Sequence, residues 1–299
     1  MTMIQIDTGK HTTKAMLGDK KIKFDSKVDL GRAQFDHSDT VNFEGLEYIV
    51  GEEASTYDMS LTKNTLHHKI LAYTSIAKLI EDESRVDIVI GTPLRLFFNE
   101  EEKSEYIKFM SNNNTPVVIS VNGNKKYFTI NRVIIAPESL GGSLLDFSES
   151  KRVIRGVLDI GGLNVNGVIY DKGKPIRKSI FTINEGTHIL ESNLKQEIMT
   201  KTSNSLEDYV LKDYLVRGCP NPKVQKIIDE YCNKFVKNLI NECLKSNWNL
   251  YDIEIYIMGG GAILLEKYLE LNFNNPIFPR DVFANVKAFG IFGERKLGR

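Results

Sequence analysis

The chain has 299 residues, which is enough for about two domains of roughly 150 residues each. Apolar residues make up 41% of the sequence and charged residues 26%, a composition that excludes wholesale disorder and fits a globular protein. The 39 Lys and Arg residues balance the 39 Asp and Glu residues, so no general electrostatic attraction to nucleic acid or acidic lipid is expected.

The pattern of apolar residues predicts strands and helices in alternation along the whole chain. In the first half, strands are expected at residues 4–9, 12–17, 21–24, 86–91, 117–121, 127–130 and 132–136, and helices at 67–80, 101–110 and 139–147. In the second half, strands are expected at 156–161, 165–170, 175–181 and 253–258, and helices at 187–200, 222–248 and 262–271.

Several common kinds of site are missing from the sequence. The three cysteines have no spacing typical of zinc ligands, and no H-E-x-x-H motif is present. The G-x-x-x-x-G-K-[ST] and G-x-G-x-x-G patterns of two widespread nucleotide-binding folds are also absent. Asp7 interrupts the N-terminus before an apolar run can form, and no stretch approaches the ~18 apolar residues of a membrane span. We therefore expect a cytoplasmic protein without a membrane partner.

An internal repeat separates the two halves of the chain. Residues 4–9 read Ile-Gln-Ile-Asp-Thr-Gly and residues 156–161 read Gly-Val-Leu-Asp-Ile-Gly, about half the chain length apart. Each copy is followed by two further β-prone runs, so each half is predicted to open with an antiparallel meander. The first turn of each meander carries Asp-x-Gly.

The chemistry of such a turn suits a phosphate group. A carboxylate such as Asp7 or Asp159 can hold a hydrated Mg²⁺, and the neighbouring backbone N–H groups can bind phosphate oxygens. Gly9, Gly161 and Gly162 would let phosphate approach the backbone closely. A single Asp-x-Gly turn is common in hairpins, but two copies at half-chain spacing favour a phosphate-binding role over a purely structural one.

A run of three glycines, residues 259–261, follows the predicted strand at 253–258 and precedes a predicted helix. A tight turn between a strand and a helix needs one glycine for its backbone geometry. Three in a row favour a surface on which the base, ribose or α-phosphate of a nucleotide can lie close to the backbone.

These motifs resemble those of a known superfamily. Asp7-Thr8-Gly9 and Asp159-Ile160-Gly161-Gly162 resemble the two phosphate motifs of the actin superfamily, and Gly259-Gly260-Gly261-Ala262 resembles its adenosine motif. The resemblance implies an α/β, actin-like (ribonuclease H-like), duplicated two-lobed ATPase fold with the nucleotide in the interdomain cleft. Domain I would comprise residues 1–150 with a C-terminal helix at about 282–299, and domain II residues 151–281.

Three further segments are most similar to ParM-type bacterial actins, which segregate plasmids by polymerising. They are Val-Ile-Gly-Thr-Pro-Leu at 89–94, Pro-Glu-Ser at 137–139 and Val-Phe-Ala-Asn-Val-Lys-Ala-Phe at 282–289. The sequence departs from the superfamily pattern at Leu163, where a polar residue is usual.

The resemblance assigns roles to individual residues. The phosphate-binding residues would be Asp7, Thr8, Gly9, Lys14, Asp159, Gly161, Gly162 and Asn164. The nucleoside-binding residues would be Gly186, Gly259, Gly260, Gly261 and Ala262. Asp7 and Asp159 would order the waters around Mg²⁺.

Glu138 is the predicted catalytic residue. It follows an apolar strand and Pro137, and its carboxylate could accept a proton from, or orient, the water that attacks the γ-phosphate. An acid at a helix N-terminus would suit the same position, since the helix dipole favours negative charge there. The resemblance favours catalysis. A sugar kinase would offer an Asp base, commonly in an Asn-Asp context, and no such pair appears near Glu138.

The resulting expectation is a nucleoside triphosphatase that binds ATP (or GTP) with Mg²⁺ and polymerises into dynamic filaments. A ParM-like protein would be linked to plasmid DNA only indirectly, through a DNA-binding adaptor of the ParR type. Two alternatives remain open. One is a kinase or phosphatase of the same superfamily that does not polymerise, and the other is a chaperone-like or cell-division scaffold that uses the nucleotide as a switch.

Overall fold

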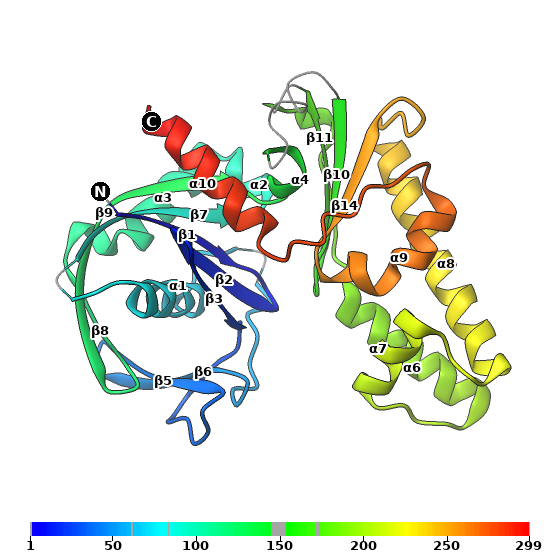
Figure 1. The fold of residues 1–299 in the computed structure, drawn as a ribbon, viewed down its shortest axis with the longest axis horizontal. Coiled ribbons are helices and arrows are strands. Elements are labelled where there is room, and N and C mark those ends of the chain that lie inside the picture. The colour runs from blue at the N-terminus through cyan, green and yellow to red at the C-terminus, as the bar shows by residue number, and fades with distance from the viewer. Residues whose placement is uncertain (1, 61, 83, 145–153, 172–173, 299) are drawn as a thin grey trace. The chain divides into compact units, whose positions relative to one another are not determined.

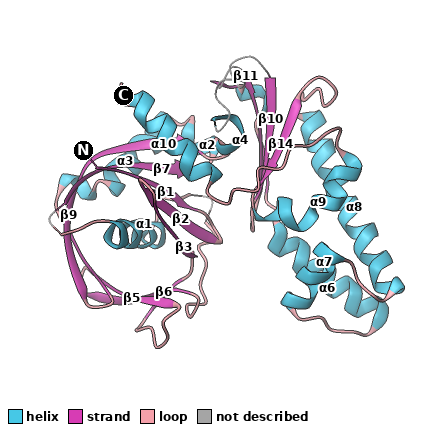
Figure 2. Ribbon diagram, viewed as in Figure 1, coloured by secondary structure: helices cyan, strands magenta, loops and turns pink. Residues whose placement is uncertain are grey.

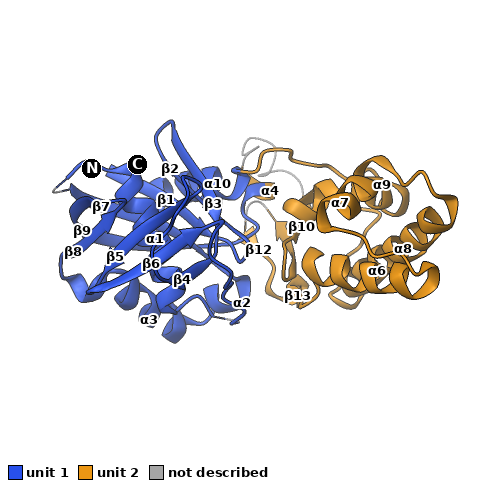
Figure 3. Ribbon diagram, turned by 90° about the horizontal axis from the view of Figure 1, so that it is seen from below, with its two compact units in different colours: residues 1–141, 283–299 blue, residues 142–282 orange. Residues whose placement is uncertain are grey.

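The computed structural model describes residues 2–60, 62–82, 84–144, 154–171 and 174–298 (Figure 1). The chain forms two compact units. Unit 1 comprises Met1–Gly141 and Phe283–Arg299, and unit 2 comprises Gly142–Val282 (Figure 3). The predicted domain boundary at residues 150 and 151 lies outside the described residues. No helix in the described parts of the chain is long and apolar enough to cross a membrane.

Unit 1 is built on a nine-stranded mixed sheet with the order β3-β2-β1-β7-β9-β8-β5-β6-β4 (Figure 2). Its strands are β1 (Thr2–Thr8), β2 (Thr12–Leu17), β3 (Lys20–Asp25), β4 (Val28–Leu30), β5 (Ser38–Phe43), β6 (Leu46–Gly51), β7 (Ser84–Thr92), β8 (Val117–Val121) and β9 (Asn124–Pro137). The predicted meander is confirmed, because β1, β2 and β3 pair antiparallel in succession. The three short strands β4–β6 were not predicted.

The sheet of unit 1 is covered by a helix on each face. Ile4 and Ile6 of β1 are fully buried in the core formed with α1 (Leu66–Leu79), while Met3 and Gln5 approach α10 (Ala284–Lys296). Because successive side chains of a strand point to opposite faces, one strand serves both helices. Figure 1 shows α1 and α10 on opposite sides of β1.

β9 is a single 14-residue strand where two were predicted. It begins after the left-handed turn at Asn122 and Gly123, whose φ angles are 51° and 81°. It pairs first with β8 and then with β7, and an extra residue at Asn131 forms a β-bulge. The buried carboxylate of Asp87 accepts hydrogen bonds from Asn131 and Arg132, which fixes the bulge.

The remaining helices of unit 1 are short. They are α2 (Leu94–Phe97), α3 (Glu100–Met110) and the 3₁₀ turn η1 (Asn112–Asn114). The predicted helix at 139–147 differs from what is observed, since α4 spans Gly141–Leu144 and residues 145–147 lie outside the described part of the chain. Ser139 has a φ of 68°, a left-handed conformation with which a right-handed helix cannot begin.

Unit 2 contains a smaller sheet with the order β12-β11-β10-β14, in which β13 also pairs with β11. Its strands are β10 (Ile154–Ile160), β11 (Val165–Asp171), β12 (Lys174–Pro175), β13 (Phe181–Ile183) and β14 (Glu254–Met258). The predicted single strand at 175–181 is wrong. A 3₁₀ turn, η2 (Arg177–Ser179), interrupts it, because the Ser179 hydroxyl donates to the Ile176 carbonyl and accepts from the backbone N–H of Ile169.

Four longer helices complete unit 2: α6 (Thr187–Thr202), α7 (Asp208–Arg217), α8 (Pro222–Lys245) and α9 (Gly260–Asn272). α8 starts at an Asn221 cap, whose side chain accepts from the N–H groups of Lys223 and Val224, and Pro222 occupies its first turn. The apolar face of α8 is buried with β10, β14 and the other three helices in a second core. Each unit therefore has its own sheet and its own core.

Candidate functional site

The first Asp-x-Gly turn lies at the end of β1 in unit 1. Asp7 is 7% exposed and stands directly opposite Lys14 on β2. Residues directly opposite in an antiparallel pair share a face of the sheet, so the ammonium of Lys14 and the Asp7 carboxylate lie on the same side. The structure thus places these two predicted phosphate ligands together.

Thr8 and Gly9 complete this turn. A Cβ atom at Gly9 would lie 2.7 Å from the carbonyl oxygen of Thr12, so the turn itself requires glycine here. The Gly9 carbonyl accepts a hydrogen bond of 2.5 Å from the Ser26 hydroxyl. The hydroxyl of Thr8 is fully buried and lies within hydrogen-bonding reach of the Tyr106 hydroxyl.

Glu138 directly follows β9, and its backbone N–H donates to the Thr92 carbonyl at the end of β7. Its carboxylate forms an ion pair with Lys63, whose side chain is 2% exposed. The Lys63 ammonium also lies 3.9 Å from a carboxylate oxygen of Asp7. A lysine that we did not predict therefore joins the predicted catalytic acid to the predicted phosphate turn.

Two further buried polar residues lie beside this group. Tyr106 of α3 is 4% exposed, and burial, together with the carboxylates of Glu138 and Asp7, raises the pKa of its hydroxyl well above the ordinary value. Ser139 is fully buried in its left-handed conformation, and its hydroxyl has no partner among the described residues. Strained backbone of this kind is concentrated at functional sites.

A second cation of the turn, Lys10, is directed toward the segment before α1. Its ammonium donates to the Ser60 carbonyl and lies 3.3 Å from Nε2 of His68. Burial and the charges of Lys63 and Lys10 hold the pKa of His68 well below its usual range, so the ring is neutral and can accept from Lys10. Burial likewise lowers the pKa of Lys10.

Asp58 fixes this segment. Burial alone would raise the pKa of Asp58, but hydrogen bonds from Ser60 and Thr65 bring that pKa below its ordinary value. The backbone N–H of Ser60 donates to one carboxylate oxygen at 2.8 Å, and the Thr65 hydroxyl donates to the other at 2.5 Å. These two bonds tie Asp58 to Ser60 and Thr65, and Lys63, which reaches Glu138, lies between those two residues in the chain.

The second Asp-x-Gly turn lies at the end of β10 in unit 2. Asp159 belongs to the strand, and the N–H of Gly161 closes the turn on the Asn164 carbonyl at 2.9 Å. The start of α6 is bonded to the same turn, since the N–H groups of Thr187 and His188 donate to the carbonyls of Gly161 and Gly162. The positive end of a helix dipole therefore lies at this turn.

Gly186 explains how α6 comes so close. Its N–H donates to the Leu163 carbonyl, and a Cβ atom at this position would lie 2.4 Å from the carbonyl carbon of Gly162. Such a contact is too short for any side chain. The glycine is thus required for the turn and the helix to meet, whether or not it also contacts a ribose.

The three glycines at 259–261 have different structural roles. Gly259 has a φ of 92°, and a Cβ atom there would lie 2.4 Å from the Ile160 carbonyl oxygen. A Cβ atom at Gly261 would lie 2.2 Å from Cγ2 of Ile160. Gly260, in contrast, is exposed and a Cβ atom would meet nothing within 4 Å. Packing thus requires glycine at positions 259 and 261. The number of glycines alone is therefore weaker support for a nucleotide site than the sequence suggested. At Gly260, packing does not require glycine.

In unit 2 the structure brings the predicted residues together around the end of β10. Asp159 lies beside Gly259, because a Cβ atom on that glycine would be 2.7 Å from its carboxylate oxygen. Ala262 is buried in the first turn of α9. The N-termini of α6 and α9 and the Asp159 carboxylate therefore lie at the turn at 161–164. The first N–H groups of α6 are already bonded to this turn, so the start of α9 is the better placed of the two to bind an anionic group.

The described residues offer a metal ion few protein ligands. Within the described ranges, no cluster of three or more His, Cys, Asp and Glu side chains is arranged to hold one. Asp7 and Asp159 each offer carboxylate oxygens, which suit Mg²⁺ that keeps most of its waters. The donor types therefore fit a hydrated Mg²⁺ bound to phosphate.

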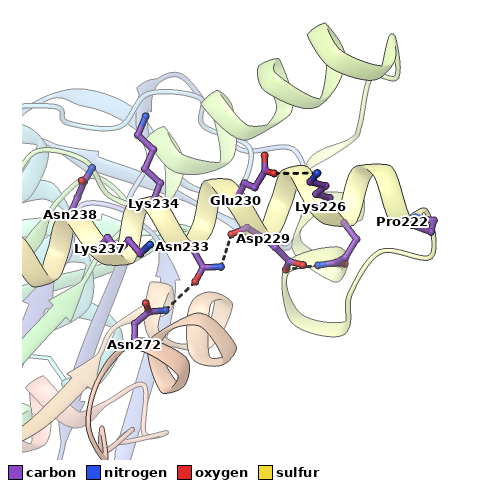
Figure 4. Close-up of a pocket in the computed structure, with 10 residues that line it drawn as sticks. Pro222, Lys226, Asp229, Glu230, Asn233, Lys234, Lys237, Asn238 and Asn272 are labelled. Atoms are coloured by element: carbon purple, nitrogen blue, oxygen red, sulfur yellow. Dashed lines mark hydrogen bonds and ion pairs between the residues drawn. The ribbon is translucent and has the colours of Figure 1, made fainter.

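A wide hollow lies elsewhere, along the outer face of α8 (Figure 4). It is lined by polar side chains such as Lys226, Glu230 and Asn233, and Asn272 of α9 donates a hydrogen bond to Asn233. Figure 4 shows these side chains engaged with one another rather than directed at a common point. None of the predicted site residues lines this hollow.

The comparisons with known proteins agree with this architecture. Residues 6–141 match the family model "Actin like proteins N terminal domain". The structure is similar to that of the archaeal actin homolog Ta0583, with a TM-score of 0.80 at 20% sequence identity over 99% of this chain and 100% of that chain. A search of curated protein sequences finds no match.

Other similar structures include a filament and a ParM protein. The Alp12 filament structure has a TM-score of 0.76 at 21% identity and covers 99% of both chains. The structure of apo pSK41 ParM has a TM-score of 0.74 at 17% identity and covers 100% of this chain and 99% of that chain. Residues 6–141 thus match an actin-like N-terminal domain, and the chain has the actin-like, two-lobed α/β fold that the sequence predicted.

Proposed function

We propose that the chain is a ParM-like nucleoside triphosphatase that binds ATP (or GTP) with Mg²⁺, assembles into dynamic filaments and hydrolyses the nucleotide. The turn at Asp7–Gly9 and the turn at Asp159–Gly162 would hold the phosphates of one nucleotide. Gly186 and residues 259–262 would contact its nucleoside. Mg²⁺, ordered through water by Asp7 and Asp159, would neutralise phosphate charge.

The observation that carries this proposal is the contact between Glu138, Lys63 and Asp7. A carboxylate held by a buried cation next to a phosphate-binding turn has the chemistry to orient an attacking water and accept its proton. In unit 2, the N-terminus of α9 beside the end of β10 has the chemistry to bind phosphate.

The similar structures support nucleotide binding and assembly. Ta0583 has been solved in complex with ADP, and the AlfA filament bound to AMPPNP has a TM-score of 0.66 to this structure at 19% identity. Another relative is a non-polymerisable mutant of pCBH ParM, with a TM-score of 0.72. In the ParM-like role, a DNA-binding adaptor of the ParR type would link the filament to plasmid DNA in the cytoplasm, and the filament itself would contact DNA only indirectly.

The test is right-angle light scattering of the purified chain after addition of Mg²⁺ with ATP, and separately with GTP, with phosphate release followed in the same cuvette. We expect scattering to rise on nucleotide addition and to decay as phosphate is released. The nucleotide that produces the larger response identifies the preferred base.

Two other outcomes would redirect the assignment. Phosphate release without scattering would contradict filament assembly and would favour a non-polymerising kinase or phosphatase of the same fold. Nucleotide binding with neither scattering nor release would favour a nucleotide-dependent scaffold or chaperone-like switch.

A further inference from the structure

Lys63 is more deeply buried than the two acids beside it, Asp7 and Glu138. Its side chain is 2% exposed, and a buried ammonium is costly unless it is paired. It pairs with Glu138 and approaches Asp7, so one cation lies between an acid on β1 and an acid that directly follows β9. Asp58, bonded to Ser60 and Thr65, ties together residues on either side of Lys63 in the chain.

The ion pair with Lys63 restricts the orientation of the Glu138 carboxylate more than the backbone around Glu138 does. Glu138 follows the end of β9, where the neighbouring Ser139 already departs from regular backbone. Without a partner, the Glu138 side chain, 12% exposed and just past the end of a strand, would have more than one rotamer available. The ion pair with Lys63 selects one of them and directs it toward the Asp7 turn.

We propose that Lys63 is a positioning residue of the nucleotide site: its ammonium orients the Glu138 carboxylate against the phosphate turn. The inference rests on the proposed function and adds to it a residue that none of the sequence motifs contains. Lys63 acts through Glu138, so its loss should lower the turnover rate rather than abolish nucleotide binding.

The test is Lys63→Met, which removes the ammonium and keeps an unbranched side chain of similar shape. A cavity of about 40 Å³ lined by Lys63, Thr92 and Tyr106 adjoins the site, so the methionine has space to adjust. The matched control is Lys78→Met, which removes another lysine ion pair of unit 1, that of Lys78 with Asp39. Melting temperature, nucleotide affinity and the maximal rate of phosphate release are measured for each variant.

We expect Lys63→Met to release phosphate about a hundredfold more slowly at saturating nucleotide, because a misplaced catalytic group costs about that factor. Nucleotide affinity should change less than about threefold, a shift well under the tenfold that 1.4 kcal/mol represents. Lys78→Met should release phosphate at the wild-type rate. Lys63→Arg, which keeps the charge, should recover part of the rate.

The outcomes are distinguishable. A folded Lys63→Met that releases phosphate at the wild-type rate would overturn the role of Lys63 and leave the proposed function intact. A wild-type chain that neither binds nor hydrolyses nucleotide would overturn the proposed function itself, and the role of Lys63 with it. If Lys63→Met fails to fold, Lys63→Gln and Lys63→Arg decide: full turnover in the uncharged glutamine variant would contradict the proposal.

Discussion

Glu138 and Lys63 show how much of the candidate site depends on single side chains. Glu138 could be singled out from the sequence because an acid directly follows an apolar strand and Pro137, and because the Pro-Glu-Ser segment resembles ParM-type proteins. Lys63 could not, because the segment before α1 carries no motif and Lys63 meets Glu138 only in the folded chain. Contacts between residues 75 positions apart are a property of the fold and leave no local pattern.

At the residue scale we predict that Glu138→Ala binds nucleotide and assembles, but releases phosphate at least about a hundredfold more slowly, as expected when a general base is lost. The filaments should therefore persist longer. Phosphate release and light scattering in one cuvette check this. The matched control is Glu100→Ala, whose side chain is 81% exposed and pairs with the neighbouring Lys103 of α3.

The same substitution also removes the partner of a buried cation. Breaking a buried ion pair by deleting one member costs up to about 3–5 kcal/mol, and the nearby Asp7 should limit that loss. Melting temperatures therefore accompany the kinetics, so that inactivity is not confused with unfolding. Unchanged phosphate release in a folded Glu138→Ala variant would show that Glu138 is structural.

At the scale of elements, the glycines between β14 and α9 give a sharp contrast. We predict that Gly261→Ala destabilises unit 2 by about 1–3 kcal/mol, the usual cost of inserting a methyl group into a packed site, because its Cβ would lie 2.2 Å from Ile160. Gly260→Ala should leave stability almost unchanged, since its Cβ meets nothing within 4 Å. Urea unfolding of both variants checks the prediction.

The same pair of variants tests the nucleoside site. If Gly260 contacts the nucleotide, Gly260→Ala should weaken nucleotide binding while the protein stays as stable as the wild type. Equal stability and equal affinity would mean that this glycine is dispensable for both. Equal destabilisation by the two substitutions would contradict the packing argument.

The elements that could be predicted are those whose apolar pattern is regular. A regular apolar pattern is present in the strands at the start of each half and in the helices α1, α3, α6, α8 and α9. In each case the observed element overlaps the predicted one. The short strands β4–β6 were missed because each is only three to six residues long and partly polar. The strand expected at 175–181 fails because side-chain hydrogen bonds of Ser179 stabilise a turn that no apolar pattern reports.

At the scale of the whole molecule, the buried neutral His68 makes stability depend on pH. The pKa of His68 is well below the ordinary value in the folded chain, whereas in the unfolded chain it is about 6.5. As the pH falls below that value, the unfolded state binds the proton first, so the free energy of unfolding decreases. The slope for one such group is at most about 1.4 kcal/mol per pH unit.

We therefore predict that His68→Gln makes the free energy of unfolding less dependent on pH between about pH 6.5 and 5 than it is in the wild type. Urea unfolding at several pH values measures this. His37→Gln, at an exposed position, should keep the wild-type slope. Identical slopes for the wild type and His68→Gln would show that His68 does not titrate in this way.

β9 connects the outer strands of unit 1 to Glu138, and its bulge at Asn131 has a consequence for how this chain can vary. Because side chains alternate between the two faces of a sheet, the number of residues from the hairpin turn to Pro137 decides toward which face the next carboxylate points. The additional residue at Asn131, held by Asp87, is part of that number. Insertion or deletion of one residue in this stretch would reverse the direction of Glu138 and separate it from Lys63, even if every side chain were otherwise retained. The length of the segment from Gly123 to Glu138 is therefore as constrained as the buried side chains that it contributes to the core.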